Sequence, residues 1–228
     1  MALPTVILPG FFAGAAPYQP VLEALNTLGI PATIVPLTRD SWWPTVGGRP
    51  MTPILTQLAA TVEQTCQQYG CDRVNVVGHS AGGWIARIFL GDQPYGGQCW
   101  QGWQRVASLV TLGTPHQSQE QWTRRNIDFV NDTYPGAFWE PVRYVCVAGR
   151  SVQGRRQWNQ WQQWIAYNSY QLTCGQGNTW GDGITPVVSA HLPGAVNLTW
   201  EDVVHSPGSS RPWYGSPALV PQWAEYLI

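Results

Sequence analysis

The sequence contains few charged residues. Asp, Glu, Lys and Arg make up only 11% of its 228 residues, and the formal net charge is −1 at pH 7; charged residues usually make up about 25% of a chain. So small a net charge gives no electrostatic reason to expect a nucleic-acid partner or a basic anchor for an anionic membrane. Any contact with a membrane surface would be transient and apolar.

Long apolar runs and metal-binding spacings are also missing. No stretch approaches the roughly 18 apolar residues of a membrane-spanning helix, and no apolar run with basic flanks resembles a signal peptide. We therefore expect a cytoplasmic protein, with peripheral attachment to a membrane as the alternative. The five cysteines are an odd number, and none has the spacing and histidine neighbours of a zinc site. Reduced, structural cysteines and no bound metal are expected.

Tryptophan, in contrast, is abundant. The chain has 14 tryptophans, several of them paired or closely spaced, as at Trp42 and Trp43 and at Trp158, Trp161 and Trp164. One interpretation is packing in the core and in covering loops. The other is an apolar rim around a substrate cleft, because aromatic rings suit acyl chains and membrane interfaces.

Short apolar runs alternate with stretches of helical periodicity along the chain. Strands are predicted at residues 3–8, 32–35, 73–77, 106–112, 142–147 and 195–200, and helices at 18–28, 52–70 and 81–90 and after Ser216-Pro217. Thr52 is the expected N-cap of the second helix, with Pro53 at its first position. Nearly continuous apolar strands that alternate with helices indicate an α/β fold with a mostly parallel central sheet and helices on both faces.

The length of 228 residues fits one domain, residues 1–228. Four stretches interrupt the alternation: 38–50, 93–104, 116–140 and 150–180, the last beginning as a helix rich in Gln and Trp. In an open parallel sheet, ligands bind beyond the carboxyl ends of the strands. We expect these insertions to form a cap over a site there.

The residues from Gly78 to Gly82 read Gly-His-Ser-Ala-Gly, directly after an apolar strand and before an apolar helix. This is the setting of a nucleophile elbow, a sharp strand-to-helix turn that lifts a serine hydroxyl clear of the sheet. Glycines flank the serine because side chains there would collide with neighbouring backbone. Ser80 is therefore the predicted nucleophile.

A serine hydroxyl needs a base to accept its proton and a carboxylate to orient that base. Of the four histidines, His205 follows the last predicted strand, which favours it over His191, before that strand, and over His116. His79 lies beside Ser80 and points the wrong way to serve as its base.

Asp182 is the predicted acid because it lies in a Gly-Asp-Gly turn between the fifth and last strands. The alternative for Asp182 is a solvated turn residue. Its rivals, Glu201 and Asp202, are too close in sequence to His205 to reach the far nitrogen of its ring.

The reaction also needs backbone N–H groups that face the developing oxyanion. Ala81, directly after the nucleophile, supplies one, and Phe11 supplies the other, with Phe12 as the alternative. Phe12, Trp42, Trp43 and His79 are the expected substrate-binding residues, the first three as an apolar wall.

Several of these motifs together resemble the α/β-hydrolase superfamily, in particular its small lipases and esterases. They are Leu8-Pro9-Gly10-Phe11, Gly78-His79-Ser80-Ala81-Gly82, Leu112-Gly113-Thr114-Pro115-His116, Gly181-Asp182-Gly183 and Val204-His205-Ser206. The resemblance implies a serine hydrolase without cofactors, with a Ser80, His205 and Asp182 triad and with Phe11 and Ala81 as oxyanion donors. Many lipases have His-Gly where this chain has Pro9-Gly10.

The expected activity is cleavage of carboxylic esters in apolar, lipid-like small molecules through an acyl-enzyme on Ser80. An acyltransferase or thioesterase with the same triad is the first alternative, because an acyl-enzyme can pass its acyl group to water, an alcohol or a thiol. A non-catalytic lipid-binding protein that keeps the fold is the second.

Overall fold

The computed structural model describes residues 2–157, 160–208 and 210–228. The strands are β1 (Thr5–Leu8), β2 (Ala32–Ile34), β3 (Val74–His79), β4 (Val106–Leu112), β5 (Arg143–Arg150), β6 (Val152–Gln153), β7 (Trp180–Gly181) and β8 (Val196–Glu201). The α-helices are α1 (Gln19–Thr27), α2 (Thr52–Tyr69), α3 (Ala81–Leu90), α4 (Gln121–Thr133), α5 (Trp161–Cys174), α6 (Val187–Ala190) and α7 (Val220–Ala224). Three short 3-10 helices are η1 (Ala16–Tyr18), η2 (Arg39–Thr45) and η3 (Gly102–Gln104).

Six strands form the central sheet in the order β2-β1-β3-β4-β5-β8. Every neighbouring pair in it is parallel, so the predicted parallel sheet is confirmed. β6 and β7 form a separate, antiparallel pair. Because parallel strands all end at the same edge, the loops that follow β1, β3, β4, β5 and β8 meet there.

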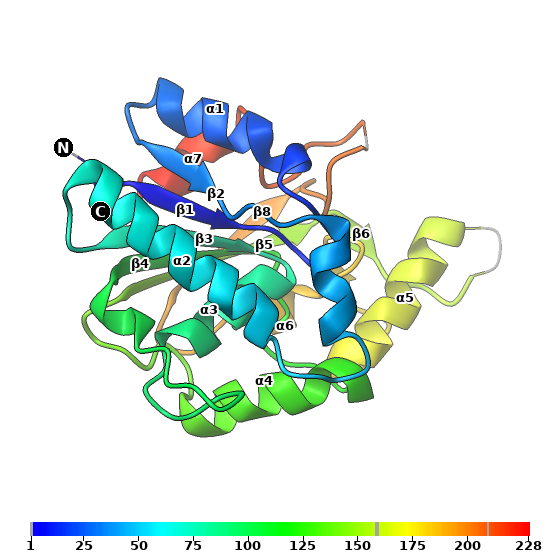
Figure 1. The fold of residues 1–228 in the computed structure, drawn as a ribbon. Helices are drawn as coiled ribbons and strands as arrows, with labels where there is room; N and C mark the ends of the chain where they lie inside the picture. Colours follow the sequence, from blue (N-terminus) through cyan, green and yellow to red (C-terminus); the bar gives the residue numbers. More distant parts are fainter. Residues whose placement is uncertain (1, 158–159, 209) are drawn as a thin grey trace.

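Alternate residues of the strands pack on opposite faces of the sheet. On β1, Val6 and Leu8 join the core with α2 and α3, whereas Ile7 joins the core with α1 and α7. Figure 1 shows these two helix pairs on opposite sides of the sheet. Burial on both faces explains why the strands read as continuous apolar runs.

The strand order places a switch point beside β1. From β1 the chain passes to β2 on one side, then crosses to β3 on the other. The loops leaving β1 and β3 therefore diverge, which opens a crevice beyond their carboxyl ends. Ser80 follows β3 and Gly10 lies just beyond β1, so the fold brings these two segments to the crevice.

Several predicted boundaries were wrong. Thr52 is the first residue of α2 and not its N-cap, because the capping position is Met51, which makes no side-chain cap. The last helix begins at Val220, because residues 216–219 form turns. The stretch at 116–140, in which no particular helix was predicted, contains α4, whose polar surface hid its periodicity.

Each of the four insertions contains a helical segment. α5 extends past the carboxyl ends of the strands (Figure 1), while η2 and η3 occupy parts of 38–50 and 93–104. All five cysteines are free thiols. In the portion of the chain that the structure describes, no helix combines the length and hydrophobicity needed to cross a bilayer.

Candidate active site

Ser80 has a strained backbone. It lies between β3 and α3 with φ 52° and ψ −124°, a conformation that costs a non-glycine residue about 1–3 kcal/mol. A Cβ on Gly78 would lie 2.6 Å from the backbone of Gly83, and one on Gly82 would lie 2.5 Å from the carbonyl oxygen of Leu8. The turn is thus closed so tightly that only glycine fits at both positions.

The end of β4 holds this turn in place. The N–H of Ser80 donates to the carbonyl oxygen of Leu112 at 2.9 Å, and Thr114 Oγ1 donates to the carbonyl oxygen of Ser80 at 2.8 Å. A Cβ on Gly83 would lie 2.1 Å from Thr114 Oγ1. These contacts fix the backbone of Ser80 against the sheet and do not involve its hydroxyl.

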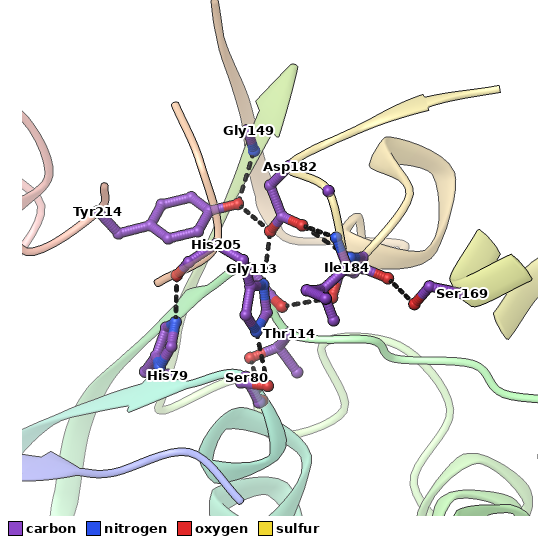
Figure 2. A network of polar contacts seen from close by, with 12 residues as sticks. His79, Ser80, Gly113, Thr114, Gly149, Ser169, Asp182, Ile184, His205 and Tyr214 are labelled. Carbon is purple, nitrogen blue, oxygen red and sulfur yellow. Dashed lines mark hydrogen bonds and ion pairs between the residues drawn. The ribbon is translucent and has the colours of Figure 1, made fainter. Parts of the chain in front are cut away.

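The three residues predicted as nucleophile, base and acid lie in contact. Ser80 Oγ is 3.0 Å from His205 Nε2, and His205 Nδ1 is 2.8 Å from Asp182 Oδ2 (Figure 2). With its Nδ1 proton donated to the carboxylate, the ring presents Nε2 as an acceptor to the serine hydroxyl. His205 is 7% exposed and Asp182 2% exposed, so the hydrogen bond between them is largely sheltered from water.

Asp182 is held by four donors. Its Oδ1 accepts from the N–H groups of Ile184 at 2.9 Å and Thr185 at 2.7 Å, and its Oδ2 accepts from His205 and from Tyr214 Oη at 2.7 Å. Burial raises the pKa of this carboxyl, but His205 and the donors outweigh burial and lower the pKa below its usual value. The group is therefore an ionised, oriented carboxylate.

Tyr214 was not expected at the site. Its Oη accepts from the N–H of Gly149 at 2.7 Å and donates to Asp182. Burial, followed by the charge of Asp182, raises the pKa of Tyr214 well above its usual value, so the phenol keeps its proton. Its sequence context, Pro-Trp-Tyr-Gly, indicates only a packed aromatic residue and gave no signal of this role.

The loop after β1 lies against Ser80. A Cβ on Gly10 would lie 3.0 Å from the Cβ of Ser80, and the N–H of Ala13 closes a turn onto the carbonyl oxygen of Gly10 at 3.0 Å. Within this turn Phe12 has a φ of 55°. Among the described residues, the N–H groups of Phe11, Phe12 and Ala81 donate to no protein acceptor. They are available to an oxygen atom bound beside Ser80.

Two cavities meet at Ser80. The first, the Trp84 cleft, has a volume of about 270 Å³ and includes Ser80, Ala81, Met51, Trp84 and Ile127 in its lining. The second, the Tyr18 groove, has a volume of about 530 Å³, and its lining includes Ser80, His205, Phe12, Pro17 and Tyr18. Phe11 and Ile184 line both. His205 lines only the second of these two cavities.

The predicted aromatic wall is only partly in place. Phe12 lines the Tyr18 groove, but Trp42 is fully buried and donates from Nε1 to the carbonyl oxygen of Ala13 at 2.9 Å. Its ring supports Phe11 edge-on at 5.3 Å. Trp43 is 60% exposed and packs against Phe12. Neither tryptophan lines these cavities; Met51 and Ile127, for which the sequence suggested no role, line the Trp84 cleft instead.

His79 differs from its expected role as a substrate-binding residue. Its ring is 4% exposed; Nδ1 is 2.7 Å from Tyr18 Oη, and Nε2 is 2.9 Å from the carbonyl oxygen of His205. Both ring nitrogens are thus satisfied by the protein. The ring edges the Tyr18 groove but has no polar group left for a substrate.

The remaining candidates lie away from Ser80. His116 contacts Thr111 Oγ1 at 3.2 Å, and His191 contacts Thr199 Oγ1 at 3.1 Å. Glu201 pairs with Arg150 at 2.9 Å. Over residues 2–157, 160–208 and 210–228, no group of His, Cys, Asp and Glu is arranged to hold a metal ion.

Exposed aromatic side chains lie on α5. Trp161 is 67% and Trp164 42% exposed on α5, and Trp161 and Ile165 line a third cavity together with His205. Trp158 lies outside the described residues. The tryptophans of α5 are therefore exposed, whereas Trp42 and Trp84 are in the core.

Acid should destabilise the fold because two histidines are buried in the neutral form. Burial, and then the charge of His205, lowers the pKa of His79 to about 3, and burial with Arg87 and His191 lowers that of His116 well below 6.5. Below pH 6.5 these two histidines bind protons in the unfolded chain but stay neutral in the folded one. The free energy of unfolding should fall by about 1.4 kcal/mol per pH unit for each such histidine.

The lowered pKa of Asp182 adds a loss of stability only below its unfolded value of 3.8. Urea unfolding at pH 7.5, 6, 5 and 4 measures the histidine effect. His79→Gln should reduce the dependence of the free energy of unfolding on pH by about 1.4 kcal/mol per pH unit, the contribution of one histidine. A free energy of unfolding that stays constant between pH 6.5 and 4 would contradict this explanation.

Known proteins resemble this chain in part of its sequence and in its whole fold. The PGAP1-like alpha/beta domain family matches residues 50–140, a range that contains Gly78 to Gly82. Triacylglycerol lipases of Pseudarthrobacter phenanthrenivorans and Burkholderia plantarii are each 38% identical over 76 residues, which is 33% of this chain. The match spans only 19% and 17% of those lipases.

Solved structures extend the likeness to the full chain. A lipase of Bacillus licheniformis in its mature form superposes with a TM-score of 0.68 at 18% identity, covering 100% of this chain and 93% of that one. A putative hydrolase of the alpha/beta superfamily from Xanthomonas campestris superposes with a TM-score of 0.55 at 14% identity, covering 99% of both chains. The chain therefore has the fold of the α/β-hydrolase superfamily and resembles the lipases and esterases within it.

Proposed function

We propose that this protein hydrolyses carboxylic esters, with Ser80 as the nucleophile, His205 as the base and Asp182 as the residue that orients the base. The observation that carries the proposal is the unbroken path from Ser80 Oγ through His205 to Asp182, at 3.0 and 2.8 Å. The strained turn aims the hydroxyl at the meeting point of two cavities.

The reaction follows from these positions. His205 Nε2 takes the proton of Ser80 as Oγ attacks the ester carbonyl, and Asp182 stabilises the imidazolium that forms. The free N–H groups of Phe11 and Ala81 bind the oxyanion, each worth about 3–4 kcal/mol of the barrier. His205 then protonates the leaving alcohol, and water releases the acid from the acyl-enzyme by the same steps.

The two cavities divide the substrate. Because His205 must reach the leaving oxygen to protonate it, the alcohol lies in the Tyr18 groove, which His205 lines. The acyl group then occupies the Trp84 cleft, which contains Ser80 and Ala81 but not His205.

The shape of the Trp84 cleft indicates the acyl group. It has an apolar wall, with Met51, Trp84 and Ile127 each at most 4% exposed, and its lining also includes the polar residues Ser118 and Thr123. At about 270 Å³ it is larger than the roughly 150 Å³ cavity known to hold benzene. A medium-length, unbranched acyl chain fits this space.

Filling the cleft should shorten the preferred acyl chain. Thr123 lines the cleft from α4, so Thr123→Trp should lower kcat/KM for an octanoate ester about 10- to 100-fold and leave acetate within threefold. The matched control is Pro17→Trp in the Tyr18 groove, which should change selectivity for the alcohol. The measurement is kcat/KM over p-nitrophenyl and methyl esters of two to sixteen carbons; a loss that is equal for acetate and octanoate would refute the acyl assignment.

The proposed function is tested by single-turnover and steady-state hydrolysis of that ester series. A burst of p-nitrophenol that approaches the enzyme concentration is expected with esters whose acyl-enzyme forms faster than water releases it. Absence of turnover and burst with every ester would overturn the proposal. Faster turnover of a thioester, or transfer to an added alcohol, would instead assign the same acyl-enzyme to thioesterase or acyltransferase chemistry.

A further inference from the structure

A second hydrogen-bonded chain runs behind Ser80 and His205. The N–H of Gly10 donates to Tyr18 Oη at 2.9 Å, Tyr18 Oη is 2.7 Å from His79 Nδ1, and His79 Nε2 is 2.9 Å from the carbonyl oxygen of His205. It therefore links the loop after β1 to the backbone of His205 through the residue next to Ser80.

The protons in this chain can be assigned from its ends. A backbone N–H can only donate, so Tyr18 Oη accepts from Gly10 and has its own proton left for His79 Nδ1. A carbonyl oxygen can only accept, so His79 Nε2 carries the ring proton and donates it to His205. Each of the three hydrogen bonds therefore has one donor and one acceptor, and a neutral His79 ring fits this assignment.

The surroundings keep both side chains neutral. Tyr18 is 3% exposed, His79 4%, and the ring of Trp213 packs edge-on against both. Burial raises the pKa of Tyr18 far above its usual value and lowers that of His79 to about 3. The arrangement of donors therefore does not change over the range in which an esterase is assayed.

We propose that Tyr18 and His79 are positioning residues. They hold the loop after β1, which carries the N–H of Phe11, and the loop of His205 at fixed positions relative to Ser80. The inference rests on the proposed function, because it gives these two residues a role only if Ser80 and His205 react. His79 is bonded covalently to Ser80. Its Nδ1 is linked through Tyr18 to Gly10 in the loop after β1, and its Nε2 contacts the backbone of His205.

The physical reason is the tolerance of the reaction to displacement. The N–H of Phe11 follows Gly10, on which a Cβ would lie only 3.0 Å from the Cβ of Ser80, and the His205 ring must stay within 3.0 Å of Oγ. A shift of 1 Å in a reacting group can cost about 100-fold in rate. Loss of either link frees one loop to move without removing a reacting group.

Three variants cut or preserve the chain. Tyr18→Phe removes the hydroxyl, His79→Phe removes both ring nitrogens, and His79→Gln keeps an acceptor for Tyr18 and a donor for His205. Tyr134→Phe is the matched control, because Tyr134 Oη also accepts a backbone N–H, from Gln93 at 2.6 Å, and donates to a side chain, Asp92 at 3.0 Å. Tyr134 is as buried as Tyr18 and lies outside both cavities at Ser80.

The readouts are kcat and KM per active site, with sites counted by end-point labelling with a fluorophosphonate, and the inhibition constant of an alkane boronic acid, which mimics the tetrahedral intermediate. Tyr18→Phe and His79→Phe should lower kcat about 10- to 100-fold with KM within threefold. They should raise the inhibition constant of the boronic acid by a similar factor. The double variant should be no slower than the slower single variant. His79→Gln should keep at least a third of wild-type kcat, and Tyr134→Phe should keep it all.

A merely structural role would lower the melting temperature of Tyr18→Phe and Tyr134→Phe alike and leave kcat per active site unchanged, which would overturn the inference. If a phenylalanine variant fails to fold, His79→Gln and the nitrogen shifts of the wild-type His79 ring decide it. A ring protonated on Nδ1, or charged at pH 6, would contradict the assigned donors. Inert wild-type protein would overturn the proposed function as well, whereas active, unaltered variants overturn only this inference.

Discussion

Ser80→Ala is expected to lower kcat/KM for the best ester about 10⁵- to 10⁶-fold, because Ser80 Oγ is the hydroxyl that contacts His205 Nε2 among the described residues. The fold should be retained, since the backbone contacts of this residue run to Leu112 and Thr114 and do not involve Oγ. Residual hydrolysis would come from the oxyanion donors and substrate binding alone. The measurement is initial rates at high enzyme concentration, with circular dichroism to confirm folding.

Ser206→Ala is the matched control for that variant. Ser206 is a second serine in the Tyr18 groove and adjoins His205 in the chain, so its loss should change kcat/KM less than threefold. Retention of more than about 1% of the activity in Ser80→Ala would mean that another group attacks the ester.

Asp182→Asn should lower kcat about 10⁴-fold with a small change in KM. The amide oxygen still accepts from Ile184 and Thr185, but the amide nitrogen then faces His205 Nδ1 and donates to it. This moves the ring proton of His205 to Nε2, where it can no longer accept from Ser80. Tyr214 also loses its acceptor, which adds a stability cost of about 1–3 kcal/mol.

Steady-state kinetics and urea unfolding of Asp182→Asn test both effects, with Glu201→Gln as the control. Glu201 pairs with Arg150 at the surface, so its variant should keep its activity within threefold. An Asp182→Asn protein with more than a tenth of wild-type kcat would show that His205 does not depend on this carboxylate for its orientation.

The sequence predicted those parts of the protein that local rules determine. Strand and helix bounds around Ser80 followed from apolar periodicity, and α3 and β4 begin and end where expected. Glycines around Ser80 marked the turn because a Cβ there meets backbone. His205 and Asp182 followed from their order along the chain, which a single fold imposes on these loops.

Contacts between distant segments were beyond local rules. Tyr214 meets Asp182 from 32 positions away, and nothing in its neighbours distinguishes a tyrosine that donates from one that only packs. Trp42 was expected to line the cleft because its position in a loop suggested this. The sequence did not reveal where its side chain points, and in the structure the ring is buried in the core and donates to the carbonyl oxygen of Ala13. The polar composition of α4 hid a helix whose buried face includes Ile127 and Val130.

The most direct test of the central claim is to treat the native protein with a fluorophosphonate and locate the adduct by peptide mass spectrometry. We predict one adduct per chain, on Ser80, formed at a rate that falls at least 1,000-fold in His205→Ala and after denaturation in urea. Ser80 should react selectively because its hydroxyl contacts the buried His205. Exposed serines elsewhere would react slowly, and at the same rate in His205→Ala. An adduct on another residue, or equal labelling of native and His205→Ala protein, would contradict the account.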